Sequence, residues 1–416
     1  MSEFSLDPYV DRYASRTLEI TASEVRALFA VASRPEVISL AGGMPYTAAV
    51  PFEALERLCE ELLTDRGPAA LQYTGGQGEP ALRERLCEIM AEEHITAHPE
   101  DVVVTAGSQQ ALDLLARIFC DPGDVVLAEA PSYTGALSAF SQYQIQVVHL
   151  PMDGDGLRVD ALVPAVKDLR ARGKRVKFLY TVPNFHNPAG VSLALERRGA
   201  LLETTASLGV LVVEDNPYGL LGFDGQILPA LRSIDPGNVI YLGTISKILA
   251  PGLRIGWVLA PPPIREKLIM VKGAADLCSP AFNQLLTELF FRRYPWRDLV
   301  KEYRGIYRER MEAMVSSLGE HMPEGTRWTV PKGGFFVWVV LPDGLDAKKI
   351  LPRAISARVA YVPGTGFFAD GQGRNALRLC YSLPPPERIR EGVRRLAGVV
   401  REELALYRAL IGGGAP

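Results

Sequence analysis

Cysteine and histidine are both scarce in this chain of 416 residues, which has five of each. The cysteines lack the CxxC spacing of zinc and dithiol sites, and the histidines lack HExxH or other close ligand spacing. We therefore expect no metal site. All cysteines except Cys278 lie in amphipathic or apolar runs, so we expect buried free thiols in a reducing compartment.

A basic excess and a long apolar run are missing too. The formal net charge is −3, whereas proteins that bind nucleic acid or membrane surfaces through charge are basic. No apolar stretch approaches the length of a transmembrane helix. The N-terminal MSEFSLDPYVDRYASR has acidic residues and no apolar core, so it does not read as a signal peptide. The sequence predicts a cytoplasmic protein with no nucleic-acid or membrane partner.

What the chain does contain is typical of a soluble globular enzyme: 48% hydrophobic and 22% charged residues. From about residue 100, short β-branched runs alternate with amphipathic segments. This alternation predicts an α/β fold with a mainly parallel, seven-stranded sheet covered on both faces. Polar and catalytic residues should gather at the carboxyl ends of its strands. The seven runs are DVVVTAG, DVVLAEAP, IQVVHLP, VKFLYTVP, GVLVVEDN, NVIYLGTIS and IGWVLAPP.

The length predicts more than one domain. Long helical segments span residues 264 to 318, and mixed strands and helices follow. We expect an N-terminal arm (1–45) that packs beside a smaller α+β C-terminal domain (296–416). The large domain then spans residues 46–295.

One lysine stands in an unusual setting, GTISKILAPGLRIGW, residues 243–257. Lys247 follows an apolar strand and is flanked by the hydroxyls of Thr244 and Ser246, with Arg254 one turn later. A desolvated lysine amine with a lowered pKa condenses with aldehydes. Hydroxyls and an arginine suit a phosphate. An aldehyde together with a phosphate describes pyridoxal 5′-phosphate, although a surface lysine beyond a strand end is the alternative.

Two earlier strand ends carry residues that fit the same ligand. Ser108 and Gln109 begin a helix, where backbone N–H groups and the helix dipole bind phosphate; a serine N-cap is the ordinary alternative. Tyr133, in EAPSY, follows the next strand. Its ring could stack on a pyridine ring, or simply pack in a loop.

Two later strand ends complete the pattern. Asn187, in NFHNPAG, could donate to a phenolate oxygen, or it could only punctuate a turn. Asp215 ends VLVVED and could keep a pyridine nitrogen protonated, or it could cap a turn. Tyr218 could share the phenolate oxygen with Asn187.

This order of residues and motifs resembles fold-type I pyridoxal-phosphate enzymes, the class I/II aminotransferases, and within them the 2-aminoadipate and kynurenine-type subgroup. The resemblance covers nearly the whole chain and implies the fold-type I architecture. The motifs that carry it are VISLAGGMP, LQYTGGQGEPALRE, TAGSQQALDL, EAPSYTGAL, NFHNPAG, VVEDNPYG, GTISKILAPGLRIGW, PKGGFFVW and NALRLCYS.

The resemblance assigns the cofactor site residue by residue. It implies that the Lys247 amine bonds to the cofactor aldehyde and that Asp215 pairs with the ring nitrogen. Tyr133 would stack on the ring, and Asn187 and Tyr218 would contact its oxygen. The residues that would hold the phosphate are Ser108, Gln109, Thr244, Ser246 and Arg254, with Tyr73 reaching the phosphate of the neighbouring subunit in a homodimer.

The resemblance also implies a substrate site. Arg378, in NALRLCYS, would bind the α-carboxylate as a bidentate pair, close to Asn187 and Gly43. Arg26 would contact the substrate side chain, although a helix-surface arginine fits its position nearly as well. Residues 74–79 depart from the family's usual proline and Glu-Gly pair, which leaves the substrate preference open. GQGEPA, residues 76–81, fits a loose dinucleotide fingerprint but follows no strand, so we reject it.

The expected activity is transfer of the amino group of an L-α-amino acid to a 2-oxo acid, with 2-oxoglutarate as the expected acceptor. The donor could be of the 2-aminoadipate, aromatic, or branched and long aliphatic type. One alternative is a pyridoxal-phosphate lyase, decarboxylase or racemase. The other is an effector domain like that of MocR-type regulators, but the 40 or so residues before the fold are too few for a DNA-binding winged helix.

Overall fold

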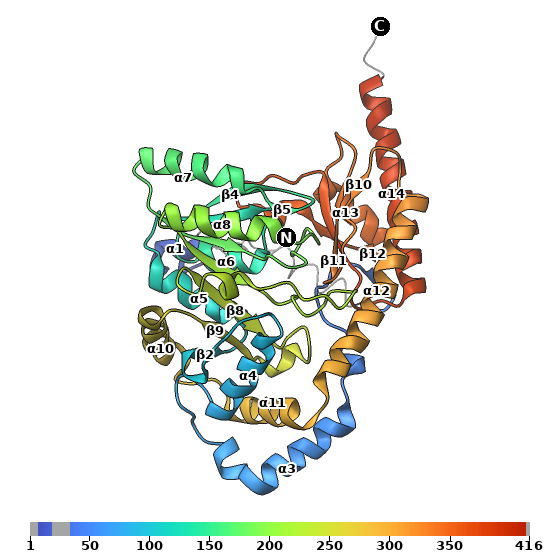
Figure 1. Cartoon of the computed structure of the whole chain (residues 1–416). Coiled ribbons are helices and arrows are strands. Elements are labelled where there is room, and N and C mark those ends of the chain that lie inside the picture. Colours follow the sequence, from blue (N-terminus) through green and yellow to red (C-terminus); the bar gives the residue numbers. More distant parts are fainter. Residues whose placement is uncertain (1–6, 19–33, 413–416) are drawn as a thin grey trace.

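The computed structural model describes residues 7–18 and 34–412 and is built around an eight-stranded sheet (Figure 1). The strand order is β2-β9-β8-β7-β6-β3-β4-β5. All seven predicted strands lie in it: β2 (Val102–Thr105), β3 (Val125–Ala130), β4 (Gln146–Asp153), β6 (Val176–Thr181), β7 (Leu211–Asp215), β8 (Val239–Thr244) and β9 (Gly256–Leu259).

The predicted number of strands was wrong by one. The eighth strand, β5 (Gly156–Leu157), pairs antiparallel with the end of β4. It has two residues and follows the turn at Gly154 and Asp155, so it is too short for a hydrophobic pattern to reveal. β9 runs antiparallel to both β2 and β8, and the pairs among β3, β4, β6, β7 and β8 are parallel. The sheet is mainly parallel, as predicted.

Alternating side chains along the strands build two apolar layers. On β3, Val125 and Leu127 belong to one buried cluster, and Val126 and Ala128 belong to another. The first cluster includes residues of α7 (Leu162–Ala171) and α8 (Leu195–Ser207). The second includes residues of α5 (Ser108–Phe119) and α6 (Thr134–Ser141). Helices therefore cover both faces, and the strands can be apolar throughout.

Four further helices lie at the β2 end of the sheet. In the view of Figure 1, α3, α4 and α11 lie in the lower part of the molecule, with α11 against α3 and α4, and α10 lies at the left, against α5 and β2. The predicted helical run 264–318 is divided into three helices because Pro280 and Pro295 stand at the starts of the second and third. The bounds of the four are α3 (Phe52–Ala70), α4 (Pro80–Ala91), α10 (Pro262–Asp276) and α11 (Ala281–Arg293).

The C-terminal part is built on α12 (Trp296–His321), which packs along α14 (Pro386–Gly412), as Figure 1 shows. Its four-stranded sheet has the order β10-β11-β14-β13. The N-terminal β1 (Ile38–Ser39) pairs with β12 (Val359–Ala360), so this early segment joins the C-terminal part. The domain limits at 45 and 295 stay a prediction. The other bounds here are β10 (Arg327–Trp328), β11 (Phe336–Val340), α13 (Ala347–Ser356), β13 (Val362–Pro363) and β14 (Ala376–Cys380).

The remaining elements are single turns. They are α1 (Ser15–Leu18), α9 (Leu231–Ile234) and the 3-10 helices η1 (Val10–Arg12), η2 (Thr47–Ala49), η3 (Pro99–Asp101), η4 (Val159–Ala161), η5 (Pro251–Leu253) and η6 (Gly364–Phe367). Within residues 7–18 and 34–412, no helix is long and apolar enough to cross a membrane.

The cysteines are only partly as predicted. All five are free thiols. Burial was predicted for four of them, but only Cys380 is buried, and Cys59, Cys87 and Cys120 are partly exposed. These three lie on or at the end of helices whose other side faces the core, so a neighbouring apolar run did not ensure complete burial.

Candidate active site

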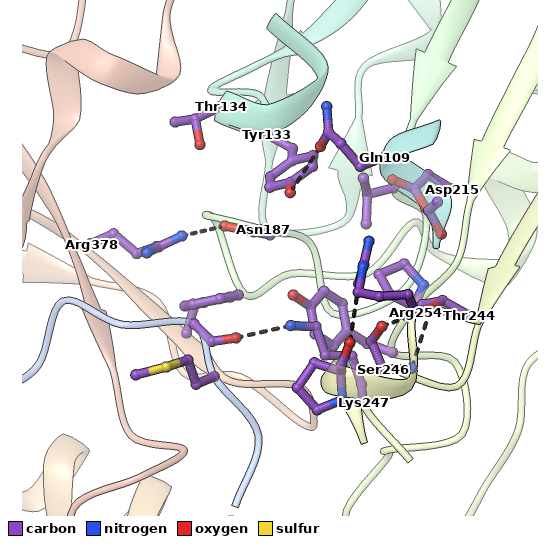
Figure 2. Close-up of a pocket in the computed structure, with 18 residues that line it drawn as sticks. Gln109, Tyr133, Thr134, Asn187, Asp215, Thr244, Ser246, Lys247, Arg254 and Arg378 are labelled. Carbon is purple, nitrogen blue, oxygen red and sulfur yellow. Dashed lines mark hydrogen bonds between the residues drawn. The ribbon is translucent and has the colours of Figure 1, made fainter. Parts of the chain in front are cut away.

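The carboxyl ends of the parallel strands meet at one edge of the sheet, and a cavity of about 310 Å³ lies there. Figure 2 shows the side chains around it, with Arg378 on one side of the view and Asp215 and Arg254 on the other. Twelve predicted site residues line this cavity: Gly43, Ser108, Gln109, Tyr133, Asn187, Asp215, Tyr218, Thr244, Ser246, Lys247, Arg254 and Arg378.

Two predicted residues are not in this group. Tyr73 lies outside the cavity, and its side chain is 78% exposed. This position does not test its predicted role, since that role is in a neighbouring subunit. Arg26 and the helix expected around it fall outside the described residues.

One end of the cavity is suited to a phosphate dianion. Helix α5 begins there at Ser108, and its first backbone N–H groups and dipole favour an anion. The Ser246 and Thr244 hydroxyls lie 2.9 Å apart, and Thr244 Oγ1 also accepts from the Ser246 backbone N–H at 3.1 Å. Arg254 donates to the Ala106 carbonyl at 2.7 Å, which holds the guanidinium beside the helix start.

Glycine makes this close approach possible. Gly107, directly before α5, has a φ of +83°, and a Cβ on it would lie 2.5 Å from a guanidinium nitrogen of Arg254. A Cβ on Gly256 would lie 2.6 Å from the Gly107 carbonyl carbon. The helix start, β9 and Arg254 can therefore meet only where these two side chains are absent.

Tyr133 presents its ring at the wall of the cavity. Its hydroxyl donates to Gln109 Oε1 at 3.4 Å, and the Gln109 amide donates to the Gly135 carbonyl at 2.8 Å (Figure 2). A Cβ on Gly135 would lie 2.4 Å from the Tyr133 ring. The ring is therefore fixed where the chain passes from β3 to α6, in the position that a stacking partner needs.

Asp215 is the buried carboxylate of the site, with 3% exposure. Its Oδ2 accepts a hydrogen bond from the Tyr180 hydroxyl at 2.9 Å, while its Oδ1 has no partner among the described residues. Burial raises the pKa of Asp215 to about 6, against the opposing effects of Tyr180 and Lys247. An unpartnered buried acceptor costs free energy, so a protonated ring nitrogen, as in pyridoxal phosphate, fits this position.

Lys247 reaches into the cavity from the turn after β8. Its amine donates to the Gly43 carbonyl at 2.9 Å and lies 5.5 Å from the centre of the Phe335 ring. Burial lowers the pKa of Lys247 to about 8, and the positive charges of Arg378 and Arg254 act in the same direction. Part of the population therefore carries a neutral amine near pH 8, as condensation with an aldehyde requires.

Arg378 is held at the opposite side of the cavity. Its guanidinium donates to Asn187 Oδ1 and to the Ala41 carbonyl, both at 2.8 Å, and its Nε has no partner among the described residues. The guanidinium carbon lies 4.3 Å from the centre of the Phe336 ring and 5.1 Å from that of Phe367. A buried cation between two rings is a receptor for a carboxylate.

Several residues around the cavity were not predicted. Met44 and Phe336 stand inside motifs that carried the family resemblance, VISLAGGMP and PKGGFFVW, so those motifs were the available signal. Tyr180 stands in a predicted strand, but a strand pattern indicates burial and not a hydrogen-bond partner. The unpredicted lining residues are Met44, Thr134, Val182, Pro217, Pro251 and Phe336.

Comparison with known proteins agrees with this geometry. The model of the aminotransferase class I and II family matches residues 35–396, and the chain belongs to that family. An aromatic-amino-acid aminotransferase of Thermococcus litoralis is 42% identical over 95% of both chains. A 2-aminoadipate transaminase of Thermus thermophilus is 40% identical, over 93% of this chain and 96% of the relative. The crystal structure of a multiple substrate aminotransferase from Thermococcus profundus matches with a TM-score of 0.91 and 41% identity, covering 96% of this chain and 100% of that one.

The chain is therefore an aminotransferase with the fold-type I architecture. The cofactor of this family is pyridoxal 5′-phosphate, and both parts of the fit are present in the cavity. The helix start with Arg254 suits the phosphate, and the unpartnered Oδ1 of Asp215 suits the ring nitrogen.

Proposed function

We propose that this enzyme transfers the amino group of an L-α-amino acid with an aromatic or 2-aminoadipate-type side chain to a 2-oxo acid, with 2-oxoglutarate as the acceptor. One observation carries the proposal: Lys247, whose pKa is lowered, and the buried Arg378 line the same cavity. The lysine suits the aldehyde of the cofactor, and the arginine suits the carboxylate of the amino acid. The choice of side chain is supported by the names of the two relatives described above, which act on these two classes of donor.

Each residue has a role that follows from its surroundings. Arg378 binds the α-carboxylate of the amino acid, and Phe336 and Phe367 shield that ion pair from water. Lys247 would hold the cofactor aldehyde, and its amine, when free, would take the Cα proton of the amino acid. Asp215 would hold the proton on the ring nitrogen, and the helix start with Arg254 would hold the phosphate. The cofactor, when bound, supplies an electron sink for the electrons left at Cα.

We also propose that the working unit is a homodimer in which Tyr73 serves the partner's phosphate site. Large apolar side chains near it are exposed in the single chain: Leu71 is 79% exposed, and Met270 and Leu277 are each 65% exposed. The loop and the end of α10 are neighbours, since a Cβ on Gly76 would contact the Leu277 carbonyl at 3.6 Å. Exposed large apolar side chains favour association. A cytoplasmic location stays a prediction, supported by the five unpaired thiols.

The visible absorbance of the purified protein tests the activity. Its pyridoxal-phosphate band should bleach with aromatic or 2-aminoadipate donors and return when 2-oxoglutarate is added. Measuring the consumption of 2-oxoglutarate and the formation of glutamate separates this reaction from lyase, decarboxylase or racemase chemistry, because only transamination consumes a 2-oxo acid. A band that no donor bleaches contradicts the proposed activity and favours an effector-binding role. A protein that stays colourless with added pyridoxal phosphate contradicts the cofactor itself.

A further inference from the structure

Tyr180 and Asp215 meet because of the register of two neighbouring strands. Tyr180 on β6 lies opposite Val213 on β7. Asp215 stands two residues after Val213, so its side chain points to the same face of the sheet. Tyr180 and Asp215 are therefore diagonal neighbours, within reach of a long side chain. Their contact is a feature of the sheet itself and does not depend on a loop.

The hydroxyl of Tyr180 is locked in place. The residue is completely buried, and its ring meets the Phe140 ring of α6 edge to face at 5.8 Å. Burial, with the nearby Asp215 charge, raises the pKa of Tyr180 well above its ordinary value. The hydroxyl therefore keeps its proton at every physiological pH, and it acts towards Asp215 as a permanent donor.

The two oxygens of the Asp215 carboxylate are thus unequal. Oδ2 is occupied by Tyr180, and Oδ1 has no partner in the described part of the chain. We propose that Tyr180 is a positioning residue for the reaction: its hydroxyl fixes Oδ2 of Asp215, and this leaves Oδ1 as the acceptor for the ring nitrogen of the cofactor. The proposal rests on the proposed function, because it needs Asp215 to pair with that nitrogen.

Tyr180 also acts on the charge of the carboxylate. The charge of Asp215 affects the pKa of five titratable groups, which are Tyr133, Tyr180, Tyr218, Tyr241 and Lys247. Of these, Tyr180 donates directly to the carboxylate, and Lys247 is the cation. A hydrogen bond to the charged form of an acid favours that form. With the cofactor bound, the protonated ring nitrogen would favour the ionised form at Oδ1, and Tyr180 would favour it at Oδ2.

Tyr180→Phe tests the proposal, because it removes one hydroxyl and keeps the ring. Losing a hydrogen bond to a charged group should slow the single-turnover half reaction by roughly ten- to a hundredfold and weaken pyridoxal-phosphate binding by a similar factor. Losing the lowering effect of Tyr180 should raise the pKa of Asp215. The acid limb of the half-reaction rate should therefore move to higher pH.

Tyr361→Phe is the matched control. Tyr361 is also completely buried and donates one hydrogen bond, to the Ala347 carbonyl, and neither residue lines the cavity. Both variants should lower the unfolding temperature of the apoprotein, but only Tyr180→Phe should change cofactor affinity and the acid limb. Tyr180→Phe could lose stability as the control does and keep both its affinity for pyridoxal phosphate and the acid limb of its half-reaction rate. Tyr180 would then be merely structural, and the inference would be overturned.

Two further variants keep the outcomes apart. If Tyr180→Phe does not fold, Phe140→Leu loosens the ring contact while the hydroxyl stays, and it should give the same shifts at smaller size. Unchanged cofactor affinity and an unchanged acid limb in Phe140→Leu then overturn the inference.

Asp215→Asn separates a failure of the inference from a failure of the proposed function. If Asp215→Asn transaminates normally, the role of Asp215 is wrong, and the inference falls with it. If Asp215→Asn is crippled while Tyr180→Phe is normal, only the inference fails.

Discussion

At the scale of single residues, the proposed activity depends on Lys247. Lys247→Ala should fold and keep the apoprotein unfolding temperature within about a degree or two, since the native amine makes one hydrogen bond to a carbonyl. It should lose turnover entirely because no other lysine stands among the described residues that line the cavity. Borohydride reduction followed by peptide mapping should attach pyridoxal phosphate to Lys247 in the native protein. Normal transamination by the variant, or a label on another lysine, contradicts the assignment.

Buried carboxylates give the apoprotein a distinct pH dependence. Burial raises the pKa of Glu93 to about 8, that of Glu214 to about 7 and that of Asp215 to about 6. A carboxyl whose pKa is raised by folding stabilises the fold fully below its ordinary value near 4, and this stability is lost as the pH rises through the folded value. Apoprotein stability from these groups should therefore decline between about pH 4 and pH 8.

Glu93→Gln isolates part of that decline. Glu93 accepts hydrogen bonds from Tyr241 and Asn216. At low pH the glutamine of the variant is destabilising because its amide disturbs these contacts. At high pH the glutamine has the advantage that it carries no buried charge. The difference in unfolding temperature between native protein and variant should shrink by several degrees from pH 5 to pH 9. Glu391→Gln is the control, because its arginine partners lower the pKa of Glu391 to about 2 and its difference should stay constant. A constant difference for Glu93→Gln contradicts the buried titration.

At the scale of elements, the start of helix α5 is the proposed phosphate site. Gly107→Ala places a Cβ 2.5 Å from a nitrogen of Arg254 and should push that guanidinium away. Pyridoxal-phosphate affinity should fall at least tenfold, as expected for loss of a charge-assisted contact. Gly123→Ala is the control, because Gly123 has a nearly equal φ of +84° but open space around it. Cofactor affinity can be measured by equilibrium dialysis. Equal affinity in the two variants contradicts the proposal that the start of α5 and Arg254 hold the phosphate.

The same scale shows what sequence patterns can predict. The seven strands with β-branched runs were found because burial on both faces requires apolar residues throughout. Residues such as Asp215 and Lys247 were found because polar groups directly after buried strands are conspicuous. β5 was missed because two residues carry no period. The contact of Tyr180 with Asp215 was not predicted because it depends on the register between β6 and β7. The sequence of either strand alone does not specify that register.

At the scale of the whole molecule, the shared site can be tested by complementation. Light scattering should report a dimer. Tyr73→Ala and Lys247→Ala should each be weakly active or inactive alone. When the two are unfolded and refolded together, one site of each mixed dimer should contain an intact Lys247 from one subunit and an intact Tyr73 from the other. Activity should then reappear, at about a quarter of the native value for random pairing. If none reappears, Tyr73 acts within its own subunit or not at all.

The backbone near the start of the described chain has a consequence of another kind. The carbonyls of Ala41, Gly43 and Met44 accept hydrogen bonds from Arg378, Lys247 and Ser382. Every amino acid offers the same carbonyl, so many replacements at positions 41 and 44 leave these contacts intact. Insertion or deletion of one residue would turn the carbonyls away from both cations together. This stretch should therefore tolerate amino-acid substitutions better than the insertion or deletion of a residue.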